Sequence, residues 1–332
     1  MPPRSPLPQR LGLDPAWLRT EGRDEADPAT WPLMRDWLVH RVGMHVDVDA
    51  FIAQGRFVTA TGVPVLAADP FRPNTFVWFY RDLPDEARVP GEVRVLYRDD
   101  RIVVVDKPAF LSTIPRGRHV RESVVVRMRN ALGLPELTPM HRLDRVTSGV
   151  LLMATERRWR GSYQSLFQYG QVTKTYRAVA GIRDDLALPV TVRNHLTKAR
   201  GTMQAEVIEG AEPNAESLVE FERELTAAEQ GALGGGARSG IYRLTPHTGK
   251  THQLRIHLCG LGIPIAGDPL YPVTLDTPVD DFSTPLQLLA SELRFVDPVD
   301  GSDRHFVSER RFPLAFESDA EAPHSQAAHT GT

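Results

Sequence analysis

The stretch from Met140 to Thr155 restricts the fold of this chain more than any other part of its sequence. It opens as a polar turn in which Asp144 lies between Arg142 and Arg145, and it continues through a Thr-Ser-Gly turn into the apolar run 150–154. This change of pattern predicts a loop that leads into a buried strand. The flanking cations favour an ionised carboxylate, which can accept hydrogen bonds or attack an electrophile. An ordinary surface ion pair beside an ordinary turn would leave the same pattern, so this stretch alone does not decide between the two interpretations.

The order of residues in this stretch resembles the signature of a known enzyme family. His-Arg-Leu-Asp at 141–144, followed after two residues by Thr-Ser-Gly at 147–149 and an apolar strand, is similar to the motif of the RluA-type pseudouridine synthases, which isomerise uridine in structured RNA. The resemblance implies that Asp144 is the catalytic residue and that Arg142 fills the space that the target base leaves in the RNA. It also implies a reaction that uses no metal, redox cofactor or nucleotide.

Further motifs follow in the order that this family shows. The hairpin that ends at Asp-Lys-Pro, residues 106–108, resembles the opening motif, whose role we expect to be structural. Lys174-Thr175-Tyr176 resembles a Lys-x-Tyr motif, which implies that Tyr176 lies under the target base. Taken alone, Tyr176 would be an ordinary strand aromatic.

The last long motif is GKTHQLRIH at 249–257, followed by GIPIAGDPLY at 262–271. The resemblance implies that Arg255 pairs with the catalytic carboxylate and that Lys250, which stands where relatives often have arginine, contacts RNA. Leu289 stands in the last core strand where the family usually has histidine. A buried leucine there indicates repacking of the core, and the alternative is a lost substrate contact. The resemblance covers about residues 93 to 314.

Charge shows how such a chain could hold RNA. The 332 residues include 39 basic and 42 acidic side chains, a net charge of −3, so any RNA site must be a local patch. Five arginines lie within fourteen residues, and we expect them to contact phosphates. They are Arg116, Arg118, Arg121, Arg127 and Arg129. The alternative is that they form an ordinary solvated surface.

Composition also indicates the cellular compartment in which the protein acts. The single cysteine, Cys259, excludes an intrachain disulfide and fits a reducing compartment. No apolar run approaches the roughly 18 residues of a spanning helix, and the proline-broken start lacks the apolar core of a signal peptide. We therefore expect a cytoplasmic protein that acts on RNA, does not associate with membranes and is a monomer.

The pattern along the chain predicts four parts. Residues 1–30 are expected to be a flexible arm, and 31–88 a small α/β domain that is either a degenerate S4-like RNA-binding module or a structural cap. Residues 89–315 are expected to form an α+β catalytic domain, in which helices flank a mixed, mostly antiparallel central sheet. A disordered tail is expected over 316–332.

The sequence of the expected catalytic domain predicts one helix and one loop from clear local patterns. The spacing of apolar residues predicts a helix over 157–168. The glycine-rich segment 229–240 is predicted to be a flexible hairpin loop.

Other functions fit less well. Gly249-Lys250-Thr251 would need a glycine where Leu244 stands to complete a phosphate-binding P-loop. The histidines at 247, 252 and 257 are spaced by five, which spreads them around a helix and disfavours a metal site. An N-glycosylase or glycosidase would need a second carboxylate, for which only Asp268 is available, in an expected turn. A non-catalytic RNA-binding or chaperone module is the remaining alternative, and either ribosomal or transfer RNA could be the substrate.

Overall fold

A computed structural model describes residues 3–22, 31–199 and 201–314. The chain divides into two compact units, Met1–Glu86 and Ala87–Thr332, and each is considered by itself. In the described ranges no helix has both the length and the apolar character needed to cross a membrane. The predicted disordered tail, 316–332, lies outside the described residues.

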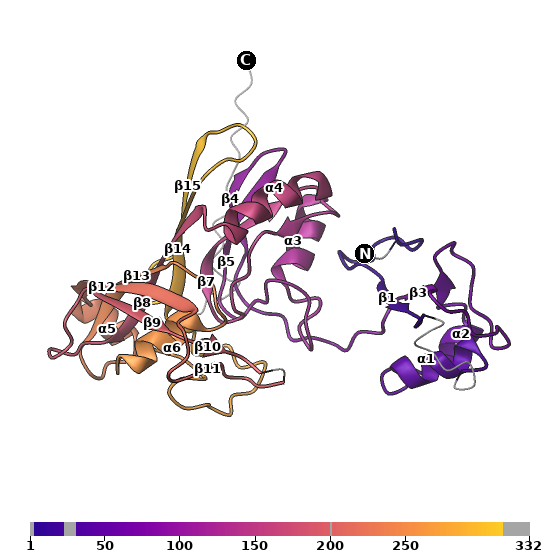
Figure 1. The fold of residues 1–332 in the computed structure, drawn as a ribbon. Helices are drawn as coiled ribbons and strands as arrows, with labels where there is room; N and C mark the ends of the chain where they lie inside the picture. The colour runs from indigo at the N-terminus through magenta and orange to yellow at the C-terminus, as the bar shows by residue number, and fades with distance from the viewer. Residues whose placement is uncertain (1–2, 23–30, 200, 315–332) are drawn as a thin grey trace, which may run out of the picture. The chain divides into compact units, whose positions relative to one another are not determined.

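The first unit packs two helices against a small antiparallel sheet (Figure 1). Its elements are β1 (Ala16–Arg19), α1 (Met34–Val42), α2 (Val48–Ala53), β2 (Val58–Thr59) and β3 (Phe76–Phe79), and the strand order is β1-β3-β2. Trp37 and Phe57 are completely buried in its core. The predicted similarity to S4-like modules stays a prediction.

The prediction of a flexible arm is wrong for β1. This strand pairs with β3, with Trp17 opposite Trp78, and Ala16 and Leu18 pack against the core of the unit. Ala16 and Leu18 alternate with Trp17 and Arg19, and this alternation is enough for a short edge strand. The neighbouring prolines led to the prediction of an arm instead. Residues 1–2 and 23–30 of the predicted arm lie outside the described part of the chain.

The second unit is built on a ten-stranded mixed sheet (Figure 1). Its order is β4-β5-β7-β14-β8-β13-β12-β9, with β15 paired to β14 and β6 paired to β7. The strands are β4 (Arg94–Arg98), β5 (Ile102–Lys107), β6 (Thr138–Pro139), β7 (Ser148–Ala154), β8 (Val172–Gly181), β9 (Val190–Asn194), β12 (Ala215–Glu224), β13 (Ser239–Pro246), β14 (Leu288–Val296) and β15 (Asp303–Val307). Within the described ranges only β7 and β14 pair in parallel. The predicted α+β fold is confirmed.

Four helices and a two-stranded ribbon complete this unit. The helices are α3 (Val124–Leu132), α4 (Arg157–Gln168), α5 (Ala227–Ala232) and α6 (Gln253–Gly260), and the ribbon is β10 (Leu196–Thr197) with β11 (Glu206–Val207). The predicted helix over 157–168 is confirmed. The prediction of a loop over 229–240 is wrong at both ends: α5, which begins at a capping box of Thr226 and Glu229, extends to Ala232, and β13 begins at Ser239.

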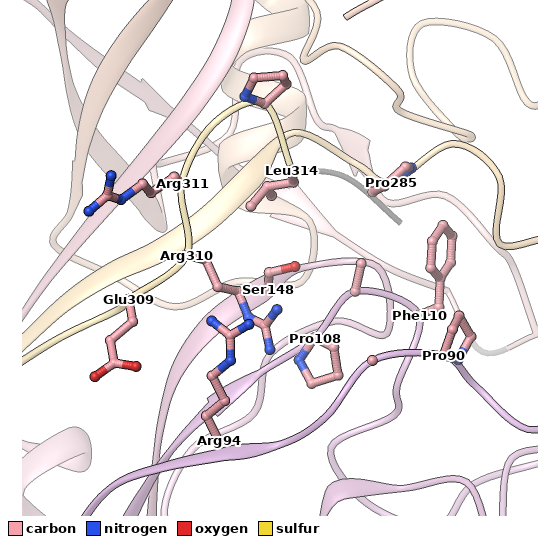
Figure 2. Close-up of a pocket in the computed structure, with 13 residues that line it drawn as sticks. Pro90, Arg94, Pro108, Phe110, Ser148, Pro285, Glu309, Arg310, Arg311 and Leu314 are labelled. Carbon is pink, nitrogen blue, oxygen red and sulfur yellow. The ribbon is translucent and has the colours of Figure 1, made fainter. Parts of the chain in front are cut away.

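The segment after β15 packs back on the end of β5. Asp106 is completely buried, and its carboxylate accepts hydrogen bonds from the Ser308 hydroxyl and from the backbone N–H of Glu309. Beside these contacts, Arg94 and Arg310 line a cavity of about 270 Å³ (Figure 2). None of the predicted catalytic residues lines this cavity, so the contacts around Asp106 belong to the framework of the sheet.

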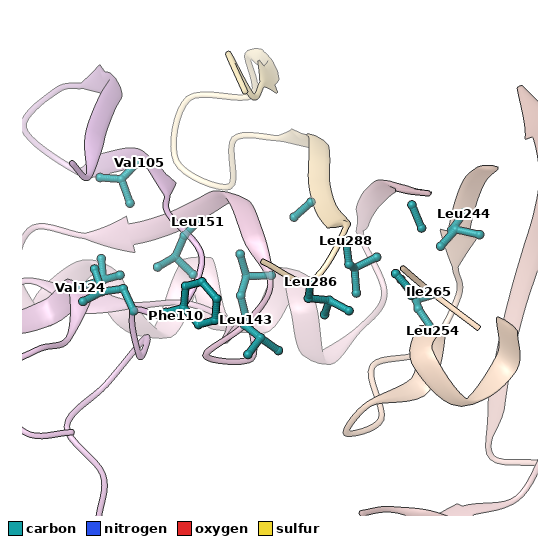
Figure 3. Close-up of a cluster of buried hydrophobic side chains, with 14 of the residues drawn as sticks. Val105, Phe110, Val124, Leu143, Leu151, Leu244, Leu254, Ile265, Leu286 and Leu288 are labelled. Atoms are coloured by element: carbon teal, nitrogen blue, oxygen red, sulfur yellow. The ribbon is translucent and has the colours of Figure 1, made fainter. Parts of the chain in front are cut away.

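The central strands are buried on both sides. Val103 and Val105 of β5 face one hydrophobic core, whereas Ile102 and Val104 face another. The first core also takes residues from α3 and α6 (Figure 3), and the second takes Tyr163 from α4. This double burial explains why β7, which begins four residues after Asp144, is fully buried along its length.

The parallel pairing of β7 with β14 depends on a glycine. Gly149 lies opposite Ala290 and has a φ of 115°, a conformation that residues with a Cβ rarely adopt. A Cβ at this position would clash with the backbone of Ala290. The close approach therefore sets the position of the loop that carries Asp144.

We predict that Gly149→Ala lowers the free energy of unfolding by at least about 2 kcal/mol, because the Cβ would break the strand pairing. Gly161→Ala is the matched control: Gly161 is exposed inside α4, nothing lies near its added Cβ, and the change should stabilise the protein by about 1 kcal/mol. Urea unfolding measures both. Equal stability of the two variants would contradict the prediction.

Candidate active site

The three predicted catalytic residues line one cleft of about 840 Å³. Asp144 comes from the loop before β7, Tyr176 from β8 and Arg255 from α6. The chain neighbours Leu143 and Leu254 are buried in the same hydrophobic core (Figure 3), and both also line the cleft. The shared core therefore holds the loop and the helix at a fixed separation.

Asp144 is partly open to solvent, with 35% of its side chain exposed. Its nearest cation is Arg255, whose Nη1 lies 3.9 Å from Oδ2, and the Nε2 atom of His252 lies 3.9 Å from the same oxygen. The expectation that the flanking arginines hold this carboxylate is wrong. Arg142 is exposed, and the guanidinium of Arg145 lies by the Phe110 ring, 5.8 Å from its centroid. A tight turn, closed by the hydrogen bond from Thr147 N–H to Asp144 C=O, separates the side chains that the sequence places together.

Arg255 has a closer partner than Asp144. Its Nε and Nη2 donate to the two carboxylate oxygens of Asp268 at 2.8 and 2.5 Å, and both side chains are almost completely buried. Asp268 also accepts hydrogen bonds from the backbone N–H groups of Leu270 and Tyr271. The sequence placed Asp268 in a turn but missed its bond to Arg255, which leaves only Nη1 directed to Asp144. The predicted pairing of Arg255 with Asp144 is therefore a longer, secondary contact.

Tyr176 forms part of the wall of the cleft. It is half-buried on β8 and packs against the same core as Leu143. Burial, reinforced by the negative charge of Asp144, raises the pKa of its phenol. The hydroxyl therefore stays protonated at neutral pH, and the ring provides an apolar surface beside the carboxylate.

Lys107 is a residue whose role the sequence left as structural. It is completely buried, and its Nζ donates to the carbonyl oxygens of Pro108, Leu111 and Arg145. Burial, followed by the charge of Arg310, lowers its pKa, while Asp144 acts in the opposite direction. Because an ammonium has three protons, these three acceptors satisfy it completely. Lys107 thus ties the residue that follows Asp144 to the end of β5.

The predicted patch of five arginines is wrong as a single surface. Arg116 lines the cleft, whereas Arg118 and Arg121 are exposed outside it. Arg127 binds Glu122 and the carbonyl oxygens of Val89 and Gly91, and Arg129 donates to the carbonyl oxygen of Leu137 at 3.0 Å. These two arginines lie on the half-buried side of α3, where their guanidinium groups hold neighbouring segments together.

The cleft is nevertheless strongly basic. Asp144 is the one acidic side chain among the described residues that line it, and seven lysines and arginines line the same cleft. They are Arg116, Arg142, Arg145, Lys174, Lys198, Lys250 and Arg255. Lys198 and Lys174 had not been predicted as binding residues. Lys174 lies within a motif, but nothing in the sequence marked Lys198, which the β10-β11 ribbon brings to the cleft.

Leu289 is buried in β14, where it lies opposite Arg177 and Ser148 on the two neighbouring strands. Its neighbour Leu288 lines the cleft, whereas Leu289 does not. A leucine at this position therefore fills space within the sheet.

Three histidines near the cleft have a lowered pKa: His257, which is buried, and His141 and His252, which are half-buried. Nε2 of His141 accepts a hydrogen bond from the N–H of Leu152, and its ring stacks on Phe167 at 4.7 Å. His257 donates from Nε2 to the Oδ1 atom of Asn194 at 3.0 Å. Burial lowers the pKa of His141 to about 3, and the pKa values of His252 and His257 to about 4. Over the ranges that the structure describes, no three or more His, Cys, Asp or Glu side chains are grouped to hold a metal ion.

Comparisons with known proteins agree with this geometry. Residues 101–259 match the family described as RNA pseudouridylate synthase. The dual-specificity RNA pseudouridine synthase RluA of Vibrio vulnificus is 32% identical over 232 residues, which cover 68% of this chain and 85% of that protein. The mitochondrial tRNA pseudouridine(32) synthase of Saccharomyces cerevisiae is 30% identical over 182 residues, which cover 54% of this chain and 37% of that protein.

A solved structure supports the fold. Human RNA Pseudouridylate Synthase Domain Containing 1 superimposes with a TM-score of 0.52 at 23% sequence identity, over 68% of this chain and 86% of that one.

The neutral histidines predict how stability depends on pH. The pKa of a histidine in the unfolded chain is about 6.5, so below this pH the unfolded chain binds protons that the folded protein does not. Stability should therefore fall as the pH drops from about 6.5 to about 4, by about 1.4 kcal/mol per pH unit for each histidine. His257→Gln removes one of these histidines, so the slope of stability against pH should become smaller by the contribution of one proton. The contribution of the carboxylates to the slope is the same in both proteins. Urea unfolding at pH 6.5, 5.5 and 4.5 measures the slope, and an unchanged slope in the variant would contradict the prediction.

Proposed function

The chain belongs to the RNA pseudouridylate synthase family and isomerises uridine to pseudouridine in RNA, and we propose that Asp144 is the nucleophile of this reaction. The observation that carries the proposal is the single carboxylate in a cleft lined by seven cationic side chains. The cations attract the phosphates of an RNA strand to the cleft, and the partial exposure of Asp144 leaves it accessible to a base that has left the RNA stack.

The reaction needs one nucleophile. The bond from N1 of uracil to C1′ of the ribose breaks, the detached base rotates, and a bond from C5 to C1′ forms. C5 loses its proton and N1 gains one, so the composition of the RNA does not change. In our proposal Asp144 attacks C1′ of the ribose or C6 of the ring, and Arg255 stabilises its charge. The ring of Tyr176 stacks on the uracil.

The contacts of Asp268 count against a hydrolytic alternative. A glycosidase or N-glycosylase of the usual type needs a second carboxyl group that donates a proton to the leaving group. Asp268 is the nearest candidate, but its carboxylate is buried and bound to Arg255 and to two backbone N–H groups. A non-catalytic binding module, in turn, would have no use for a half-exposed carboxylate among phosphate-binding cations.

We propose that the substrate is a structured RNA and that it enters along the basic cleft. The relatives named above are described as acting on tRNA or as having dual specificity, which makes transfer RNA and ribosomal RNA the substrates to test first. Exposed Arg142 and Lys250 at the cleft are suited to contact phosphates or to fill the space of the displaced base. The lone Cys259 fits a reducing compartment such as the cytoplasm.

Asp144→Asn should keep the fold and the affinity for RNA but reduce pseudouridine formation by at least about 10⁴-fold, because the amide keeps the shape of the side chain and is not a nucleophile. Release of tritium from RNA that carries 5-tritiated uridine measures the rate, and filter binding measures the affinity. Asp184→Asn, at an exposed carboxylate that does not line the cleft, is the control. Turnover within tenfold of the parent would exclude Asp144 as the nucleophile.

Replacing Arg116 and Lys198 together by glutamine should weaken RNA binding and flatten the slope of log affinity against log salt by about 1 to 2, as expected when up to two phosphate contacts are lost. Arg98→Gln, which removes an exposed cation that does not line the cleft, should leave the slope unchanged. An RNA-binding titration between 50 and 200 mM salt, the range over which phosphate contacts show most clearly, measures all three proteins. If the double variant and the control have the same slope, the RNA follows another path.

A further inference from the structure

His252 lines the cleft in an unusual backbone conformation and has no role in the reaction proposed above. It precedes α6 with a φ of 58°, in the left-handed region that few residues other than glycine adopt. Only 9% of its side chain is exposed. Residues held in such conformations concentrate at functional sites, where surrounding contacts maintain them. The contacts of the ring show what the conformation achieves.

The two nitrogen atoms of the ring face different partners. Nε2 lies 3.9 Å from Oδ2 of Asp144, and Nδ1 lies 2.9 Å from the hydroxyl of Tyr271. The Nη1 atom of Arg255 also lies 3.9 Å from Oδ2. For both nitrogen groups the nearest oxygen of the carboxylate is therefore Oδ2.

The Tyr271 hydroxyl decides which nitrogen of His252 carries the proton. Its oxygen accepts a hydrogen bond from the N–H of Ala205 at 2.8 Å, and its own proton has two acceptors within reach, of which Nδ1 of His252 is nearer than the carbonyl oxygen of Ala205. The carbonyl oxygen of Ala205 lies 3.2 Å away and Nδ1 of His252 lies 2.9 Å away. Donation to Nδ1 places the imidazole proton on Nε2, facing Asp144. The other tautomer would direct the lone pair of Nε2 at a carboxylate.

The charges around His252 keep the ring neutral. Burial is the main cause of its low pKa, and Arg255 and Lys198 act in the same direction, while Asp144 and Asp268 act against it. A neutral ring with its proton on Nε2 is a hydrogen-bond donor that adds no positive charge next to Arg255.

We infer that Tyr271 and His252 are positioning residues for Asp144: Tyr271 fixes the tautomer with the proton on Nε2, and His252 and Arg255 together hold Oδ2, so that Oδ1 is the attacking atom. This inference rests on the proposed role of Asp144 as the nucleophile. Closure of the cleft around the substrate shortens the 3.9 Å separations to hydrogen bonds. Holding one oxygen fixes the direction in which the other attacks, which lowers the entropic part of the barrier.

A matched pair of variants tests the donor. His252→Met removes it, whereas His252→Gln retains an N–H donor on a side chain of similar length and is equally unbranched, so both meet the same backbone strain. We expect the methionine variant to lower the single-turnover rate at saturating RNA by about 10- to 100-fold and to leave the RNA affinity within twofold. The glutamine variant should recover at least tenfold of the lost rate. Equal rates in the two variants, or a loss that appears in RNA affinity instead, would overturn the inference.

The tautomer can be observed without an activity measurement. Long-range proton–nitrogen NMR spectra of the parent protein labelled at histidine distinguish the two neutral forms, and we expect the proton of His252 on Nε2. Tyr271→Phe should mix the two forms and lower the single-turnover rate. A proton on Nδ1 in the parent would overturn the inference even if the histidine variants failed to fold. Inactive Asp144→Asn alongside a fully active His252→Met would leave the proposed nucleophile standing and reject the positioning pair.

Discussion

The buried pair of Arg255 and Asp268 is the interaction on which the cleft depends. Two charges that leave water are tolerated only when their hydrogen-bonding capacity is nearly filled. Here the pair is bidentate, and the backbone N–H groups of Leu270 and Tyr271 take further lone pairs of the carboxylate. The pair joins α6 to the turn at 268–271. That turn places Tyr271, and through it His252, beside Asp144.

Charge is distributed so that attraction for a polyanion is local. Residues 1–86 contain nine basic and twelve acidic side chains, a net charge of −3, and residues 87–332 contain thirty of each. The whole net charge of the chain therefore belongs to the first unit, which by charge alone does not attract RNA. Seven cations line the cleft of the balanced second unit, and Asp144 is the one acidic residue of the described ranges that lines it with them. A net charge near neutrality limits nonspecific adhesion, while the cleft retains a positive potential.

The sequence predicted the framework better than the contacts. Residues 157–168 were predicted as a helix because their apolar period is strong, and the central strands were predicted because double burial leaves continuous apolar runs. The start of α5 was missed although Thr226 and Glu229 spell a capping box, since the glycines that follow outweighed it. Strand β1 was missed because its pairing partner, β3, lies some sixty residues away in the chain.

The residues of the site also divide into those that a local motif marks and those that only contacts between distant segments bring to the cleft. Asp144, Tyr176 and Arg255 were found because local motifs mark them, and the structure brings all three to one cleft. A motif does not show with which residue each charged side chain will pair. The bond of Arg255 to Asp268, the use of Arg127 and Arg129 inside the fold, and the arrival of Lys198 from the ribbon all depend on contacts between distant segments.

Arg255 divides its guanidinium between two carboxylates in different states. Asp268, at 2.5 to 2.8 Å, is buried and accepts four hydrogen bonds, so it is not accessible to an electrophile. Asp144, at 3.9 Å, feels the positive charge but forms no direct bond to it, and it is 35% exposed. A cation at that distance leaves the lone pairs of Asp144 unoccupied. The tight bond to Asp268 holds Arg255 in place, so the buried carboxylate keeps the exposed one free until the substrate closes the cleft.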